Sequence, residues 1–171
     1  MEEQPGLCAV TVTVIDKDGA SDSAAATNFI VIYDPEDGFV TGGGWIWSLP
    51  GAYHANPDLE GIATFGFVSK YRKGANVPSG STEFQFHAGD LNFRSTSYVW
   101  LVVNKSGSNA QFMGYGTING TGTYGFMIWA SDGLPDSFRI KIWVAGVEGN
   151  VIYDNGTNQP LGGGNIVVHT K

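Results

Sequence analysis

The sequence predicts an all-β protein, folded as an antiparallel β-sandwich that is either jelly-roll-like or a flattened barrel. Composition is the first observation: 25 of the 171 residues are glycine, 13% are aromatic and only 15% are charged. Glycine and aromatic residues favour strands joined by tight turns over helices. The second observation is about ten short segments that alternate apolar and polar residues, with turn residues between them. Many short strands of this kind are typical of a sandwich or a barrel.

Ten strands are expected after residue 38, and most neighbours in sequence should pair as hairpins. Their expected positions are 39–47, 62–68, 82–87, 90–94, 98–104, 110–118, 122–130, 137–144, 149–153 and 164–169. Asn119-Gly120 is a strong hairpin signal, because both residues tolerate positive φ. The similar pieces GGGWI (42–46) and GGGNI (162–166) could be paired, glycine-bulged strands. Trp45 is expected to plug an end of the sandwich, with a ligand cleft as the alternative.

A further hairpin is expected near the N-terminus. Residues 9–15 alternate with period two, Asp16–Gly19 supply turn chemistry, and 24–33 form the second strand. The segment 7–34 resembles the last two strands of a PKD (polycystic kidney disease-like) domain, which has an immunoglobulin-like sandwich. The earlier strands of such a domain are missing, so the hairpin should pack on the second module or on another chain.

The remaining chain carries a second resemblance. Segments 38–46, 65–71, 82–86, 91–93 and 162–169 are similar to a β-rich domain that often follows PKD repeats in secreted bacterial and archaeal proteins. The two resemblances divide the chain into a truncated PKD-like hairpin (1–34) and a β-sandwich module (35–171), with a Pro- and Gly-containing linker at 34–38. They imply a secreted or cell-surface location and no particular reaction.

Charge and composition exclude several classes of protein. The net charge of −7 disfavours nucleic acid as a partner, and no apolar stretch is long enough to span a bilayer. The first residues lack the basic start and apolar core of a signal peptide, so Met1 is expected to mark a fragment boundary. The single cysteine, Cys8, allows no internal disulfide and is expected to be a small buried hydrophobe.

Strand alternation predicts a binding face. Phe84 and Phe86 should point into the core while Gln85 and His87 point outward, and the same argument applies to the later strands. The expected ligand-binding residues on this face are Gln85, His87, Arg94, Trp129, Lys141 and Trp143. An aromatic ring among hydrogen-bonding groups is how many sugar-binding surfaces are built, because the ring covers the apolar face of a pyranose. The alternative is a solvated face with an incidental tryptophan, which is the commoner case.

Catalytic and metal signals are weak. The sequence lacks a zinc-binding histidine motif and a serine nucleophile elbow. If the protein is an enzyme, Glu83, His87 and Asp90 are the candidates, with His87 as general base. Asp132 and Asp136 are candidate ligands for a structural calcium ion, with ordinary turn chemistry as the alternative. No other cofactor is expected.

Three functions remain open at this stage. The first is a non-catalytic extracellular binding or adhesion module that recognises a glycan. The second is a structural spacer or assembly unit, in which the N-terminal hairpin joins another copy by strand addition. The third is a small hydrolase acting on polysaccharide or ester substrates.

Overall fold

The computed structural model describes residues 6–8, 11–25, 30–32, 38–147 and 149–170, and nearly all of them lie in strands or turns. The helical content of this described part is a single 3-10 turn at His87–Gly89. Antiparallel pairing joins every strand to its neighbours. The predicted all-β, antiparallel fold is therefore confirmed.

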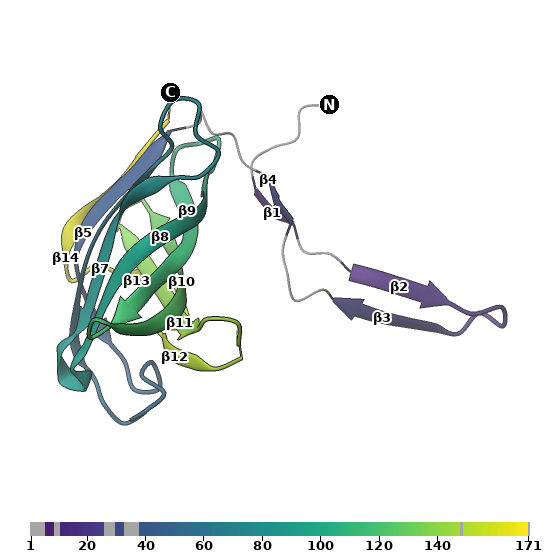
Figure 1. Cartoon of the computed structure of the whole chain (residues 1–171), viewed down its shortest axis with the longest axis horizontal. Coiled ribbons are helices and arrows are strands. Elements are labelled where there is room, and N and C mark those ends of the chain that lie inside the picture. The colour runs from purple at the N-terminus through teal and green to yellow at the C-terminus, as the bar shows by residue number, and fades with distance from the viewer. Residues whose placement is uncertain (1–5, 9–10, 26–29, 33–37, 148, 171) are drawn as a thin grey trace.

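Two small two-stranded sheets precede the main sheet (Figure 1). β2 (Thr11–Ile15) pairs with β3 (Ser21–Ala25), and β1 (Gly6–Cys8) pairs with β4 (Ile30–Ile32). The β2–β3 hairpin confirms the predicted one, although its second strand begins earlier than expected. The predicted linker lies outside the described residues, apart from its last glycine, and so does the side chain of Cys8.

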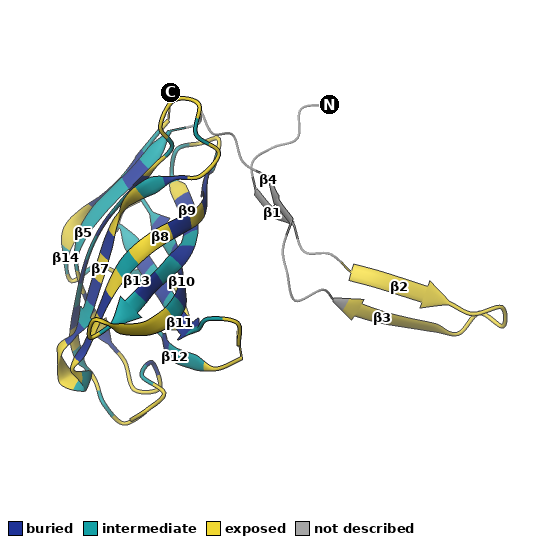
Figure 2. Ribbon diagram, in the orientation of Figure 1, coloured by how far each residue is buried: buried dark blue, intermediate teal, exposed yellow. Residues whose placement is uncertain are grey.

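The β2–β3 hairpin does not pack on the described part of the main sheet. Every residue from 11 to 24 is exposed, as Figure 2 shows. Asp16 shapes the turn, because its carboxylate accepts hydrogen bonds from the backbone amides of Asp18 and Ala20 at 2.8 and 2.9 Å. The sequence analysis expected the hairpin to pack either on the second module or on another chain. The structure does not show the β2–β3 hairpin packed on the second module.

The main sheet has ten antiparallel strands. These strands are β5 (Phe39–Ser48), β6 (Gly61–Lys70), β7 (Ser79–Phe86), β8 (Leu91–Val103), β9 (Asn109–Ile118), β10 (Thr121–Ser131), β11 (Ser137–Val144), β12 (Val151–Asp154), β13 (Gln159–Pro160) and β14 (Gly163–His169). From β5 to β12 each strand pairs with the next in the chain, β13 pairs with β11, and β14 returns to pair with β5. A meander of this kind is the order of a flattened barrel rather than of a jelly roll, which is built from Greek keys.

The two glycine-rich pieces pair with each other, as the sequence suggested. Gly163 lies opposite Trp45, and Ile166 lies opposite Gly42, in one unbroken register without a bulge. Only glycine fits at Gly44, where a β-carbon would lie 2.3 Å from the carbonyl oxygen of Gly163. The two strand backbones therefore approach closely at this edge of the sheet.

The core lies between two layers of the curved sheet and is built from aromatic rings. Phe65 of β6 stacks on Phe138 of β11 with ring centroids 3.9 Å apart, and Phe84 of β7 meets Tyr153 of β12 at 4.7 Å. The fully buried Phe84 and Phe138 confirm the alternation expected for β7 and β11. The side chains of β5–β9 that point away from this core form the surface considered next.

Candidate functional site

A polar surface covers the outer side of the sheet from β5 to β9. Cross-strand pairing places Trp45 beside Thr64, Thr64 beside Gln85, and Gln85 beside Asn92. Side chains directly opposite on one face are close neighbours, so these residues form a row perpendicular to the strands. We call this surface the outer furrow.

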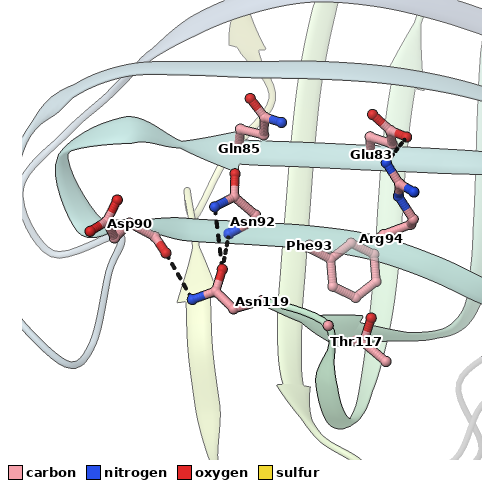
Figure 3. Close-up of a pocket in the computed structure, with 9 residues that line it drawn as sticks. Glu83, Gln85, Asp90, Asn92, Phe93, Arg94, Thr117 and Asn119 are labelled. Carbon is pink, nitrogen blue, oxygen red and sulfur yellow. Dashed lines mark hydrogen bonds and ion pairs between the residues drawn. The ribbon is translucent and has the colours of Figure 1, made fainter.

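One part of the outer furrow is a hollow of about 590 Å³ over β7, β8 and β9 (Figure 3). Its lining consists mostly of polar residues, together with one glycine and the buried Phe93. These residues are Glu83, Gln85, Asp90, Asn92, Phe93, Arg94, Thr117, Asn119 and Gly120. Side-chain amides and hydroxyls of this kind can both donate and accept hydrogen bonds, which suits a ligand rich in hydroxyl groups.

Asn119 fixes one end of this hollow. It occupies the predicted Asn-Gly turn with a φ of +51°, and its side-chain amide donates to the carbonyl oxygen of Asp90 at 2.9 Å. The Asn119 Oδ1 accepts from the backbone amide of Asn92 at 3.0 Å and from its side-chain amide at 3.3 Å. The β7–β8 and β9–β10 turns are thereby tied together.

Charge in the hollow is partly balanced by an ion pair. Arg94 donates to Glu83 at 2.9 Å across β7 and β8, and both side chains stay largely exposed. Figure 3 shows Gln85 between this pair and Asp90 along the wall of the hollow. The polar groups of Gln85 and Asn92 carry no charge and lie at the centre of the hollow.

A second, adjoining hollow of about 470 Å³ extends the furrow over β6. Glu83 and Gln85 line both hollows, and Thr64, Gly66 and Ser81 belong to the second one. Thr64 also contacts His87, whose Nε2 lies 3.4 Å from the threonine hydroxyl. The two hollows therefore form one furrow that crosses the strands.

Exposed apolar side chains form a platform at the β5 end of the furrow. Trp45 is 36% exposed, Trp47 is 48% exposed, and Ile62 lies directly opposite Trp47. Trp45 packs against Gly162, where a β-carbon would lie 2.2 Å from the indole ring. The indole nitrogen of Trp47 donates a hydrogen bond to the Glu60 carboxylate at 3.3 Å, which holds this ring in place. The expectation that Trp45 plugs an end of the sandwich is wrong, because the ring lies on the outer surface against Gly162 and Gly163, which lie just before and at the start of β14.

The predicted ligand-binding residues divide into two groups. Gln85 and Arg94 line the furrow, and His87 lies at its margin beside Thr64. Trp129, Lys141 and Trp143 belong instead to β10 and β11, two and three strands beyond β8. The structure therefore does not gather the six residues into one site.

Neighbouring groups bury Trp143 and cover one face of Trp129. Trp143 is only 7% exposed and covers Gly125, where a β-carbon would lie 2.5 Å from its ring. The Arg139 guanidinium sits over the ring of Trp129 at 4.5 Å and donates to Asp154. Alternation correctly gave the outward direction of these rings, but Trp143 is buried and Arg139 lies over one face of Trp129. The tryptophans that are exposed on the outer side of the sheet are instead Trp45 and Trp47.

The catalytic candidates lie on the same surface without forming a triad. Glu83 is paired with Arg94, and the described hydrogen-bond partner of His87 is Thr64. In the described part of the chain, His87 has no ion pair with Glu83 or Asp90. The described geometry therefore does not show His87 oriented as a general base by a carboxylate.

Asp132 and Asp136, the calcium candidates, hold the last strand in place. The Asp136 carboxylate accepts from the backbone amides of Ile166 at 2.7 Å and Gly133 at 2.9 Å. Asp132 accepts from the amide of Val168 at 3.0 Å. On the edge of β14 that has no partner strand among the described residues, these two side chains thus accept the amides of Ile166 and Val168. The described residues contain no cluster of three acidic, histidine or cysteine side chains suited to a metal ion.

The fold and the furrow define an all-β protein with a long polar surface groove and an aromatic platform. Comparison with family models, curated proteins and solved structures found no match for this chain. None of the described segments is a helix long and apolar enough to cross a membrane.

Proposed function

We propose that this protein is a non-catalytic, secreted or cell-surface module that binds carbohydrate through the outer furrow. The observation that carries the proposal is the single row in which Trp45, Thr64, Gln85 and Asn92 lie side by side. An exposed indole can cover the apolar face of a sugar ring while the neighbouring amides and hydroxyl bind its hydroxyl groups.

The furrow also fits this function electrostatically. Its central groups are uncharged, and the one ion pair beside them is internally balanced. The overall charge of −7 disfavours polyanionic ligands such as nucleic acid. Neutral glycans remain, and they are bound by shape and hydrogen bonding rather than by charge.

Binding of the purified protein to a glycan array tests the proposal. Trp45→Ala and Gln85→Ala should each weaken binding to every recognised glycan by at least about tenfold, equivalent to about 1.4 kcal/mol. Leu134→Ala removes an exposed apolar side chain from a loop outside the furrow and is the control. Absence of glycan binding by the wild type, or equal binding by all four proteins, would reject the proposed function.

A second candidate function is assembly of several copies through the N-terminal hairpin, and the exposure of β2 favours it. Val12 and Val14 are 59% and 65% exposed, and both edges of the β2–β3 ribbon lack a described backbone partner. Such an edge can accept a strand from another chain. Light scattering should give a larger mass for the wild type than for a Val12→Lys, Val14→Lys variant, and a monomer in both would exclude this role.

A further inference from the structure

Gly43 and Gly66 face each other across β5 and β6 on the outer side of the sheet. A β-carbon on Gly66 would meet nothing within 4 Å, and one on Gly43 would lie 3.6 Å from the nearest atom, an ordinary contact distance. Both positions therefore have room for a side chain. We call this pair the glycine saddle.

Every other glycine in the strands of the main sheet has a local structural reason to be glycine. At most of them a β-carbon would overlap a neighbour at less than 3.0 Å, and at the others φ is positive. The first group is Gly42, Gly44, Gly80, Gly114, Gly116, Gly125 and Gly163; the second is Gly61, Gly122 and Gly164. The glycine saddle alone has neither reason.

The backbone at the saddle also makes no demand for glycine. Neither residue has a positive φ, and the β5–β6 and β6–β7 registers run through the saddle without a shift. Glycine inside a strand weakens it, because the residue loses more conformational freedom on folding and has no side chain to pack. Where packing does not explain such a glycine, close approach of a ligand to the backbone is one of the common reasons for it.

The saddle lies beside the row of proposed binding residues, two residues away along β5 and β6. Gly43 precedes Trp45 by two residues on the same face of β5, and Gly66 lies opposite Glu83 and lines the second hollow. A ligand that rests on Trp45 and reaches the polar hollow near Asn92 therefore passes beside the saddle. From β5 to β8 this path crosses three strand intervals, or roughly 14 Å.

We infer that the outer furrow binds an extended, uncharged oligosaccharide that crosses the strands, and that the glycine saddle is a subsite for one of its inner sugar units. This inference rests on the proposed function and adds the class of ligand. The length of the path calls for several linked rings rather than a single sugar. The uncharged Thr64, Gln85 and Asn92 along it favour a neutral chain over an acidic one.

Gly66→Val tests the subsite, because it fills the saddle without a clash to the β-carbon and gives β6 a residue that favours strands. Gly149→Ala is the matched control: it also adds a β-carbon in open space, but in a turn outside the furrow. Affinities are measured for neutral and acidic oligosaccharides of one linkage, from the disaccharide to the hexasaccharide, together with thermal unfolding of each protein.

For the wild type, affinity should rise with chain length and favour the neutral series. Gly66→Val should lose at least about tenfold in affinity for the longest neutral chains while its thermal midpoint stays equal or rises. Equal binding of long chains by the wild type and a folded Gly66→Val would overturn the subsite, as would an affinity independent of length. If the wild type binds no glycan of any length, the proposed function itself fails.

Discussion

The indole of Trp45 lies directly against Gly162, which has no side chain to hold the ring away from the sheet. One face of the ring is covered by this glycine while the side chain as a whole stays 36% exposed. The pairing of Gly163 with Trp45 and a hydrogen bond from the Gly162 amide to the Trp45 carbonyl at 2.9 Å fix the arrangement. The aromatic platform thus depends on the glycines before and within β14.

Gly162→Ala should displace the Trp45 ring without unfolding the protein. The added β-carbon would lie 2.2 Å from the far end of an exposed side chain, which can rotate away. We expect a stability loss below about 1 kcal/mol and a changed resonance of Trp45 in fluorotryptophan NMR, with the signal assigned by Trp45→Phe. An unchanged Trp45 signal would contradict the contact, and Gly149→Ala should leave it in place.

Asp136→Ala should destabilise the protein by about 1–3 kcal/mol, because it removes the acceptor for the amide of the buried Ile166. Asp136→Asn keeps one acceptor oxygen and should cost less. Asp58→Ala, at an exposed loop position, should have almost no effect. Chemical denaturation measures all three, and equal stability of Asp136→Ala and Asp58→Ala would show that the carboxylate does not hold β14.

A calcium measurement tests whether Asp132 and Asp136 bind a metal ion or only accept backbone hydrogen bonds. Asp132 and Asp136 together already accept three backbone amides, so the fold does not require a cation to satisfy them. We expect the same thermal midpoint in calcium and in chelator. A higher midpoint in calcium that disappears in Asp132→Asn would restore the metal-binding interpretation.

Tyr153 makes stability depend on alkaline pH. Its buried hydroxyl donates to Ser48 at 2.9 Å, and burial raises its pKa to about 12, opposed by the Ser48 hydrogen bond and supported by the charge of Asp154. The pKa of Tyr153 is higher in the folded protein than the unfolded value of 10. The protonated tyrosine therefore contributes its full stabilisation of the fold below pH 10, and this stabilisation is lost as the pH rises through 12. The free energy of unfolding should fall by about 3 kcal/mol across this window.

Tyr153→Phe separates this contribution from that of other groups. Burial also raises the pKa of Tyr98, so some loss above pH 10 should remain in the variant. Urea denaturation at several pH values should therefore give a smaller loss for Tyr153→Phe than for the wild type. Identical pH dependence in the two proteins would show that Tyr153 is not the responsible group.

Period-two alternation predicted the main sheet well because it depends only on which residues avoid water. It failed at Ser95–Ser97, three small polar residues that look like a loop between two strands. In the structure β8 continues through them with register shifts, so one long strand replaces the two expected. A polar run can remain in a strand when the sheet bends there and its neighbour still supplies hydrogen bonds.

The candidate site was only half predictable from sequence for a related reason. Alternation shows that Gln85 and Trp143 point outward, but it does not show whether other outward side chains cover them. Trp143, on β11, lies over Gly125 beside Met127, two strands beyond the last strand of the furrow. The sequence feature that could have indicated an exposed Trp45 was the repeated glycine segment. Its two copies pair with each other, and Trp45 lies opposite Gly163.

Trp143→Ala should therefore affect stability. The residue is 7% exposed and packs with Trp100, Val102 and Met127. Removing it should cost about 3–5 kcal/mol, the usual range for a large aromatic side chain lost from a packed cluster, and Trp143→Phe should cost less. Trp45→Ala, at an exposed position, should cost far less in chemical denaturation. A folded Trp143→Ala of wild-type stability that no longer bound glycans would instead place the recognition surface on β10 and β11.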